Sequence, residues 1–400
     1  MNFAELAWSY LRARPLGTLL NVLLLALGVG TIGFVLIVDG QVGDSLNRDA
    51  KGIDLVVGAK GSPIQLILSG IFHLDVPTGN IPVGAAAELA ANPLVKRVIP
   101  VSIADSFRGY WILGTTPDYV SLYDGTFAAG SLWHEKMQAV LGAAVAARTQ
   151  LGVGDRFVGS HGLAEGGPVH GDSVYTVVGV LNPTGTVLDR VALVDPESIW
   201  FVHEGAIRDA DERKVLEAER QFTALLIQYR SPLAAVTLPR KINAETNLQA
   251  ASPAYESARL FRIVGVGADV IRAFGGVVLA TAALSLFIAL YHALNERAYD
   301  IAVLRTLGAR PSGIAWMLML EALMLAALGG MLGLALAHGM AALLARWMAD
   351  QQSLRIDPWA FTAGELWLLV PAFLAAALAA LLPSWRAAHA DISATLARRN

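Results

Sequence analysis

The side chains best suited to bind a metal ion gather in one glycine-rich segment, residues 159–172. Its two histidines, His161 and His170, lie close in sequence to the carboxylates of Glu165 and Asp172. Neutral imidazole and carboxylate are ligands that suit a zinc-type ion. The histidines lack the tight H-x-x-x-H spacing of helical metal sites, so a flexible loop without a metal is the competing interpretation. His161 and His170 are therefore candidate zinc ligands.

The residue types of a phosphate-binding loop occur in the segment Gly58-Ala59-Lys60-Gly61-Ser62. The spacing G-x-x-x-x-G-K-[ST] that cradles a phosphate is not present there. The sequence contains no cysteine, which excludes thiolate chemistry and disulfides. Nothing in the sequence selects a Ser/His/Asp arrangement, so we predict no catalytic residues and no nucleotide site in this chain.

The chain contains four long apolar blocks, and the elements that they form must position the candidate residues. The chain is 55% hydrophobic and only 16% charged, with a mean hydropathy of +0.52. Each block reaches the roughly 20 residues that cross a bilayer as a helix. The first block is too long for a signal-peptide core and no A-x-A site follows it, so we expect it to be retained. We predict spans at 15–39, 269–294, 312–345 and 366–385.

Basic residues near the ends of the spans indicate the orientation. The two tails and the loop after the second span contain eight arginines, whereas the loop 346–365 contains two arginines and three carboxylates. Cytoplasmic segments are the ones enriched in arginine and lysine. We expect residues 1–14, 295–311 and 386–400 in the cytoplasm, and residues 40–268 and 346–365 in the periplasm, outside a bacterial inner membrane.

The inserted segment 40–268 is long enough to bury its own core. Its pattern alternates between strand-like and helical runs, which predicts an α+β domain. Strands are expected at 52–57, 95–102, 174–181 and 223–229, and helices at 83–91, 135–151 and 209–221. Helical patterns at 39–48 and 240–271 predict that the first and second spans continue outward as a stalk. The chain is thus expected to be a polytopic α-helical membrane protein with a large α+β periplasmic domain.

Two cytoplasmic segments have helical patterns of their own. Residues 1–14 place their apolar side chains at 3–4 spacing, which predicts an amphipathic helix on the membrane surface. In the middle loop, Ala298, Ile301, Leu304 and Leu307 form one apolar stripe. Gly308 is placed to end that helix, and Pro311 to begin the next. The alternative for the middle loop is an ordinary connection without a docked helix.

This middle loop resembles a family signature. Glu296-Arg297, followed by Asp300-Ile301-Ala302-Val303-Leu304-Arg305-Thr306-Leu307-Gly308-Ala309, is similar to the coupling helix of MacB/FtsX/LolC-type ABC transporter permeases. The ending Pro383-Ser384-Trp385-Arg386-Ala387-Ala388 resembles the P-x-x-R-A-A motif of the same family. The resemblance implies that the ATPase-coupling residues are Glu296, Arg297, Asp300, Leu304, Arg305 and Gly308.

An acidic residue and two glycines in the third span are further candidates. A carboxylate at Glu321 needs a partner, and Arg297 and Arg305 are the candidates beside it in the elbow; a position facing the headgroups is the alternative. Gly329 and Gly333 permit close helix packing, either within the chain or between two copies.

The resemblance implies a complex of two permeases, as a homodimer or heterodimer, with two separate ATPase subunits that bind ATP and magnesium. MacB itself has a fused ATPase, and this chain departs from it there. ATP-driven motion would reach the periplasmic domain for export or extraction of a substrate. Regulation of a periplasmic enzyme, through a periplasmic protein partner, and zinc-linked transport are the alternatives. Nucleic acid is not expected as a partner, because the chain has no basic tract.

Overall fold

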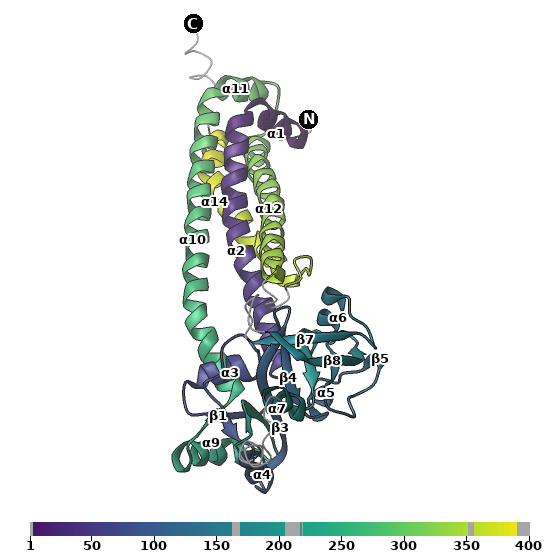
Figure 1. Cartoon of the computed structure of the whole chain (residues 1–400). Coiled ribbons are helices and arrows are strands. Elements are labelled where there is room, and N and C mark those ends of the chain that lie inside the picture. Colours follow the sequence, from purple (N-terminus) through teal and green to yellow (C-terminus); the bar gives the residue numbers. More distant parts are fainter. Residues whose placement is uncertain (1–2, 162–168, 205–216, 218, 351–355, 390–400) are drawn as a thin grey trace. The chain divides into compact units, whose positions relative to one another are not determined.

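The computed structural model describes residues 3–161, 169–204, 217, 219–350 and 356–389 (Figure 1). The chain divides into two compact units. We call residues 1–42, 264–349 and 355–400 the helical unit, and residues 43–263 with 350–354 the inserted unit. The helix expected at 209–221 lies largely outside the described residues.

The helical unit contains the four expected spans. Within the described residues, four helical segments are long and apolar enough to cross a membrane. They are α2 (Pro15–Asp49), α10 (Pro253–Glu296), α12 (Pro311–Asp350), and α13 (Ala363–Trp367) with α14 (Leu369–Ala388). At 35 and 44 residues, α2 and α10 are much longer than a bilayer requires. Both helices continue without a break into the segment between the first and second spans.

Small residues let α2 pack closely against α12. A Cβ atom added to Gly329 would lie 2.6 Å from Leu25 Cβ, and one added to Gly333 would lie 2.7 Å from Val29 Cβ. No side chain larger than hydrogen fits at these two positions without a shift of the helices. The structure therefore places both glycines in a contact within the chain, which was one of the two alternatives.

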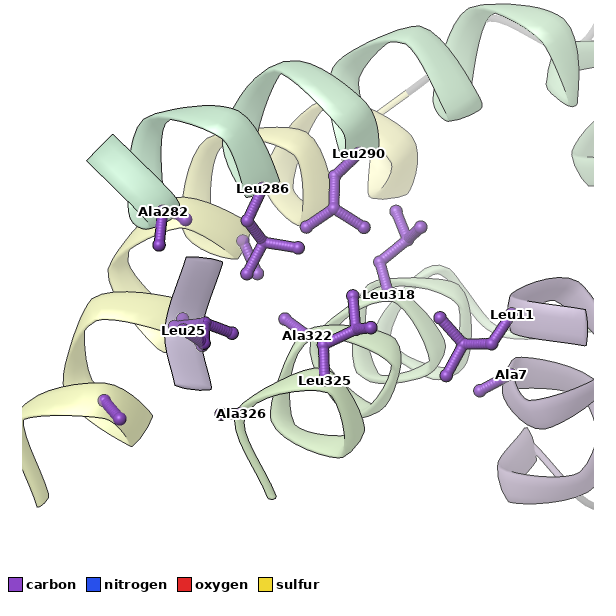
Figure 2. Close-up of a cluster of buried hydrophobic side chains, with 14 of the residues drawn as sticks. Ala7, Leu11, Leu25, Ala282, Leu286, Leu290, Leu318, Ala322, Leu325 and Ala326 are labelled. Carbon is purple, nitrogen blue, oxygen red and sulfur yellow. The ribbon is translucent and has the colours of Figure 1, made fainter. Parts of the chain in front are cut away.

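Apolar side chains from several helices fill the centre of the helical unit. Figure 2 shows Leu25 of α2 among side chains of α10 and α12, and α14 contributes further small residues to the same cluster. The buried residues labelled there are Ala7, Leu11, Leu25, Ala282, Leu286, Leu290, Leu318, Ala322, Leu325 and Ala326. Leucines from one helix meet alanines from the next, so the helices approach closely.

The amino-terminal helix α1 (Phe3–Ala13) is part of this core. Ala7 and Leu11 are buried in the cluster, and a Cβ added to Gly313 would lie 2.6 Å from Phe3 Cζ. The helix is amphipathic as expected, but its apolar face is covered by protein. That face packs against α12, which offers it an apolar surface with a glycine-sized recess, and the position of the helix at the membrane surface stays a prediction.

One part of the inserted unit is an antiparallel sheet with helices packed on it. Its strand order is β12-β1-β11-β3. The strands are β1 (Leu55–Ala59), β3 (Val95–Phe107), β11 (Ala224–Tyr229) and β12 (Leu248–Ala251). Helices α3 (Pro63–Gly70), α4 (Gly84–Ala90) and α9 (Leu233–Glu245) pack against it, and a short ladder joins β2 (Ile81–Pro82) to β10 (Gln221–Phe222). We call this part the sheet.

The other part is a ring of strands that closes on itself. Strand β3 bends at a bulge between Ile103 and Asp105 and continues into pairs with β4 and β7. From there the pairing runs β4-β9-β6-β8-β7 and returns to β3. The further elements are β4 (Tyr110–Thr115), β5 (Phe127–Gly130), β6 (Gln138–Leu141), β7 (Arg156–His161), β8 (Val169–Leu181), β9 (Val191–Val194), α5 (Asp118–Leu122), α6 (Ala143–Thr149), α7 (Pro196–Glu204) and the 3-10 helix η1 (Val187–Arg190). We call this part the barrel.

Two expected helices of the inserted unit are corrected. The segment 135–151 forms strand β6 and then α6, because residues 138–141 pair with β8 and β9 on both sides. The segment 240–271 is interrupted between α9 and α10 by β12. Asn243 stabilises this non-helical segment, since its Oδ1 accepts a hydrogen bond from the Ala250 N–H at 2.7 Å. Such side-chain hydrogen bonds compete with helix formation, and the spacing of apolar residues does not predict them.

Candidate functional site

The short helix α11 (Ala298–Thr306) lies between the ends of α10 and α12. Figure 1 shows α11 and α1 at the same end of the helical unit. The glycine that follows α11, Gly308, has a φ of +97°, a conformation that glycine adopts without strain. Pro311 begins α12 at a position where its missing N–H is not needed. A docked helix, rather than an open connection, therefore occupies the middle loop.

The side of α11 that faces the bundle is shorter than the sequence pattern indicated. Ile301 and Ala302 are buried, and Leu304 is half-buried. Leu307, the last member of the expected stripe, is 80% exposed. The helix ends at Thr306, so the chain turns toward Gly308 before the helical spacing can bring Leu307 back to the bundle. Leu307 therefore does not share the buried position of Ile301, although both belong to the apolar stripe of the sequence.

An ion pair fixes the junction between α10 and α11. Arg297 Nη1 lies 3.1 Å from Glu321 Oε2 of α12, and the two side chains are 7% and 6% exposed. Of the two partners that the sequence offered for Glu321, the structure selects Arg297. The Arg297 guanidinium also lies 3.8 Å from the centre of the Tyr10 ring in α1. A buried pair of this kind strongly resists the loss of either member, because the remaining charge would be left without a partner.

Tyr10 lies among the apolar residues of the amino-terminal helix, and its local sequence does not distinguish it from them. Burial raises the pKa of its hydroxyl above the ordinary value, and the nearby Arg297 opposes that shift. Its role under a guanidinium could be suspected only once the fold placed α1 beside α11. A second contact holds the same helices, because Arg14, which links α1 to α2, forms an ion pair with Glu296 at the end of α10.

The carboxy-terminal motif reaches back to the same place. Arg386 of α14 donates a hydrogen bond from Nη1 to the Tyr291 hydroxyl at 2.8 Å, and its guanidinium lies over the Tyr291 ring. Arg305 of α11 donates to the Ala388 carbonyl at 3.3 Å. The two sequence motifs are thus in contact, although Arg305 and Ala388 are 83 residues apart. Tyr291 was missed, since nothing in its local sequence distinguishes it from other residues of the second span.

The opposite side of α11 is exposed. Tyr299 and Asp300 on the helix, and Leu307 after it, present an aromatic ring, a carboxylate and an apolar side chain. The candidate residues therefore divide by role. Glu296, Arg297 and Arg305 fasten α11 to its neighbours, Gly308 turns the chain, and Asp300 lies on the outer side. We call Tyr299, Asp300 and Leu307 the outer face of α11.

The lysine of the Gly58–Ser62 segment has a structural role. Lys60 Nζ donates to the carbonyl oxygens of Asn243, Thr246 and Leu248, at 2.7, 3.2 and 3.1 Å. These carbonyls end α9 and the turn after it, where a helix leaves acceptors without partners within the helix. The ammonium group complements the negative end of the helix dipole.

The candidate metal ligands lie on neighbouring strands, His161 at the end of β7 and His170 near the start of β8. Their side chains, and residues 162–168 between them, lie outside what the structure describes. Among the described residues, no group of three histidine, aspartate or glutamate side chains is arranged to hold a metal ion. Zinc binding by His161 and His170 stays a prediction.

Comparisons with known proteins agree with this arrangement. The model of the MacB-like periplasmic core domain matches residues 18–244, which is more than half of the 400-residue chain. The model of the FtsX-like permease C-terminal matches residues 272–392. No curated protein matches the chain.

Solved structures resemble part of the chain. The periplasmic region of MacB from Actinobacillus actinomycetemcomitans is 10% identical, with a TM-score of 0.34, over 54% of this chain and 97% of that one. The extracellular domain of the noncanonic ABC-type transporter YknZ from Gram-positive bacteria is 12% identical, with a TM-score of 0.30, over 50% of this chain and 99% of that one.

The two family models match residues in both units. Their descriptions agree with the four spans and the α/β insertion that the structure describes. The chain belongs to the MacB/FtsX-type family of ABC transporter permeases, and it is a multi-pass membrane protein with a MacB-like domain between its first and second spans.

Proposed function

We propose that this chain transmits the motion of a separate ATPase subunit to its MacB-like domain, where a substrate is exported or extracted. The ATPase would bind ATP and magnesium and would dock on the outer face of α11. The complex would contain two permease copies in a bacterial inner membrane, with the inserted unit in the periplasm.

The observation that best supports this proposal is the difference between the two sides of α11. One side is fastened by Arg297 to Glu321 of α12 and by Arg305 to the end of α14. The other side exposes Tyr299, Asp300 and Leu307. Buried and charged contacts join α11 to the bundle. A displacement of the outer face would therefore be passed to the bundle and not be lost in a flexible loop.

Two long helices support the second half of the proposal. α2 begins directly after α1, and α10 ends directly before α11. Both continue as unbroken helices into the inserted segment. Backbone hydrogen bonds run along the whole of each helix, so a push at one end reaches the other with little bending. The lengths of 35 and 44 residues exceed what the membrane alone would require.

A single substitution on the outer face tests the proposal. Leu307→Asp places a carboxylate where an apolar side chain would enter the partner's surface, and it disturbs no packing, since Leu307 is 80% exposed. The chain would be purified from its native membranes, and ATP hydrolysis in the eluate would be measured per mole of permease. We expect hydrolysis to co-purify with the parent chain and to be lost with Leu307→Asp.

Val236→Asp is the matched control, because Val236 is an exposed apolar residue of α9 in the inserted unit. It should retain the co-purifying hydrolysis. If Leu307→Asp also retains it at equal yield, the outer face of α11 is not where the ATPase docks.

A further inference from the structure

The last residue of α2, Asp49, has a fully buried carboxylate within the inserted unit. Its Oδ1 accepts a hydrogen bond from the Val187 N–H at 2.6 Å, and its Oδ2 lies 3.1 Å from Arg190 Nη2. Its main-chain carbonyl accepts a hydrogen bond from the Tyr123 hydroxyl at 2.8 Å. All three partners are distant in sequence, so this helix end is held by tertiary contacts.

These contacts are strong ones. A carboxylate is expensive to bury unless it is paired and hydrogen-bonded. Asp49 has both a cationic partner and a backbone donor, and hydrogen bonds to charged groups are stronger than neutral ones. Removal of its charge would leave the Arg190 side chain, which is only 15% exposed, without its carboxylate. The Asp49 contacts therefore resist separation.

The segment that Asp49 binds leads directly into the barrel. Val187 and Arg190 begin and end η1, and the next residue, Val191, begins β9. β9 is paired on both sides, with β4 and with β6. The turn before η1 is itself stiffened, because the Asp189 carboxylate accepts hydrogen bonds from the Thr184 and Gly185 N–H groups at 2.8 Å each. A force on η1 would thus reach a central strand of the barrel.

The sheet is joined to α2 in a different way. Leu55, which begins β1, follows Asp49 closely along the chain. The sheet therefore follows α2 through covalent bonds, whereas η1, which leads into β9 of the barrel, meets the end of α2 through the non-covalent contacts of Asp49. The barrel also follows the sheet through β3, which the two parts share, so the Asp49 contacts are a second link, which ties the η1 side of the barrel to α2.

We infer that Asp49 is the joint that makes the barrel move with α2, through its contacts with Val187, Arg190 and Tyr123. Asp49 is a positioning residue in this account. The inference rests on the proposed function, since α2 must move for the joint to have a use. The rigidity of the joint, however, can be measured with no nucleotide present.

The absence of cysteine from the chain makes a spin-label experiment direct. Asn47→Cys on α2 and Val153→Cys in the barrel, both exposed, would be labelled in the full chain in membranes. Without nucleotide, the distance distribution between the labels should be narrow in the parent and clearly broader with Asp49→Asn. Asp44→Asn, an exposed acid five residues earlier on the same helix, should leave it narrow.

A second label pair and a second variant guard against misfolding. Val153→Cys with Val174→Cys, both on the barrel side, should give the same distribution with and without Asp49→Asn, which shows an intact barrel. Tyr123→Phe removes one hydrogen bond to Asp49 and should broaden the first distribution less than Asp49→Asn does.

An unchanged, narrow distribution between Asn47→Cys and Val153→Cys in the Asp49→Asn chain would overturn the inference. A different measurement tests the proposed function. If that function is wrong, ATP with vanadate will change no label distance in the parent complex, although the nucleotide-free difference between the parent and Asp49→Asn will still be seen.

Discussion

At the scale of single residues, the molecule relies on a few buried charges whose partners come from distant parts of the chain. Arg297 and Glu321 show the pattern, because each is buried and each is the other's counterion. The sequence could indicate that Glu321 needs a basic partner, since a carboxylate in a span is costly alone. It could not choose between Arg297 and Arg305, because the choice depends on how α11 turns relative to α12.

Glu321→Gln should therefore destabilise the helical unit markedly. The glutamine has nearly the same shape, but it leaves the Arg297 guanidinium buried without a carboxylate. We expect a loss of about 3 kcal/mol, the size seen when one member of a buried pair is removed. Thermal unfolding of the full chain in detergent would measure it. Asp300→Asn, an exposed change on α11, should leave the melting temperature unchanged, and an equal effect of both variants would contradict the role of the pair.

His73 gives the inserted unit a dependence on pH. Its Nδ1 lies 2.9 Å from the Ser69 carbonyl, so it donates there, and its Nε2 lies 3.2 Å from the Tyr119 hydroxyl, so it accepts. Burial lowers the pKa of His73 from 6.5 to about 4. As the pH falls from about 6.5 to about 4, His73 is therefore protonated in the unfolded state and stays neutral in the folded state. Stability should drop across that range by about 3 kcal/mol from this group.

The contribution of His73 can be separated from that of other groups by substitution. His73 has a φ of +54°, a conformation that asparagine tolerates, so His73→Asn should fold and should not titrate. The unfolding free energy of both chains would be followed between pH 7.5 and pH 4.5. The variant should lose less stability than the parent on acidification, and identical slopes would show that His73 does not titrate as described.

At the scale of elements, the helices of the bundle were predictable and the inserted unit was predictable only in part. The spans are long, continuous and apolar, so composition alone indicates them. The segment 135–151 is different, because the pairing of β6 with β8 and β9 overrides a local helical pattern. The break between α9 and α10 contains β12, which pairs with β1 near the start of the inserted unit. Such outcomes depend on partners far along the chain, which a window of sequence does not contain.

The contact between α2 and α12 gives a prediction at this scale. Gly333→Ala would bring a methyl group to within 2.7 Å of Val29 Cβ, so the helices must separate. Overpacking of this kind costs about 1–3 kcal/mol. Gly339→Ala is the matched control, because nothing lies within 4 Å of a Cβ at Gly339 on the same helix. Melting temperatures of the full chain should fall for Gly333→Ala alone, and a similar fall for both would show that the loss does not come from the contact with Val29.

At the scale of the whole molecule, the expected orientation can be tested with the same cysteine-free background. Val236→Cys and Leu307→Cys are both exposed, and they belong to the inserted and the helical unit respectively. A membrane-impermeant maleimide added to spheroplasts should label Val236→Cys at once and Leu307→Cys after the cells are opened. The reverse order would invert the topology and place α11 where it could not meet an ATPase of the cytoplasm.

The route of the chain through the inserted unit determines when that unit can be completed. Strand β1 lies between β11 and β12, so the sheet pairs residues 55–59 with residues 224–229 and 248–251. The sequence of the barrel is enclosed between these partners. Contacts of such long sequence separation form slowly, because the entropy of a large loop must be lost before they stabilise anything. During synthesis the first strand of the sheet waits unpaired until nearly the whole insertion has emerged, and assembly of the sheet ends just as the second span begins.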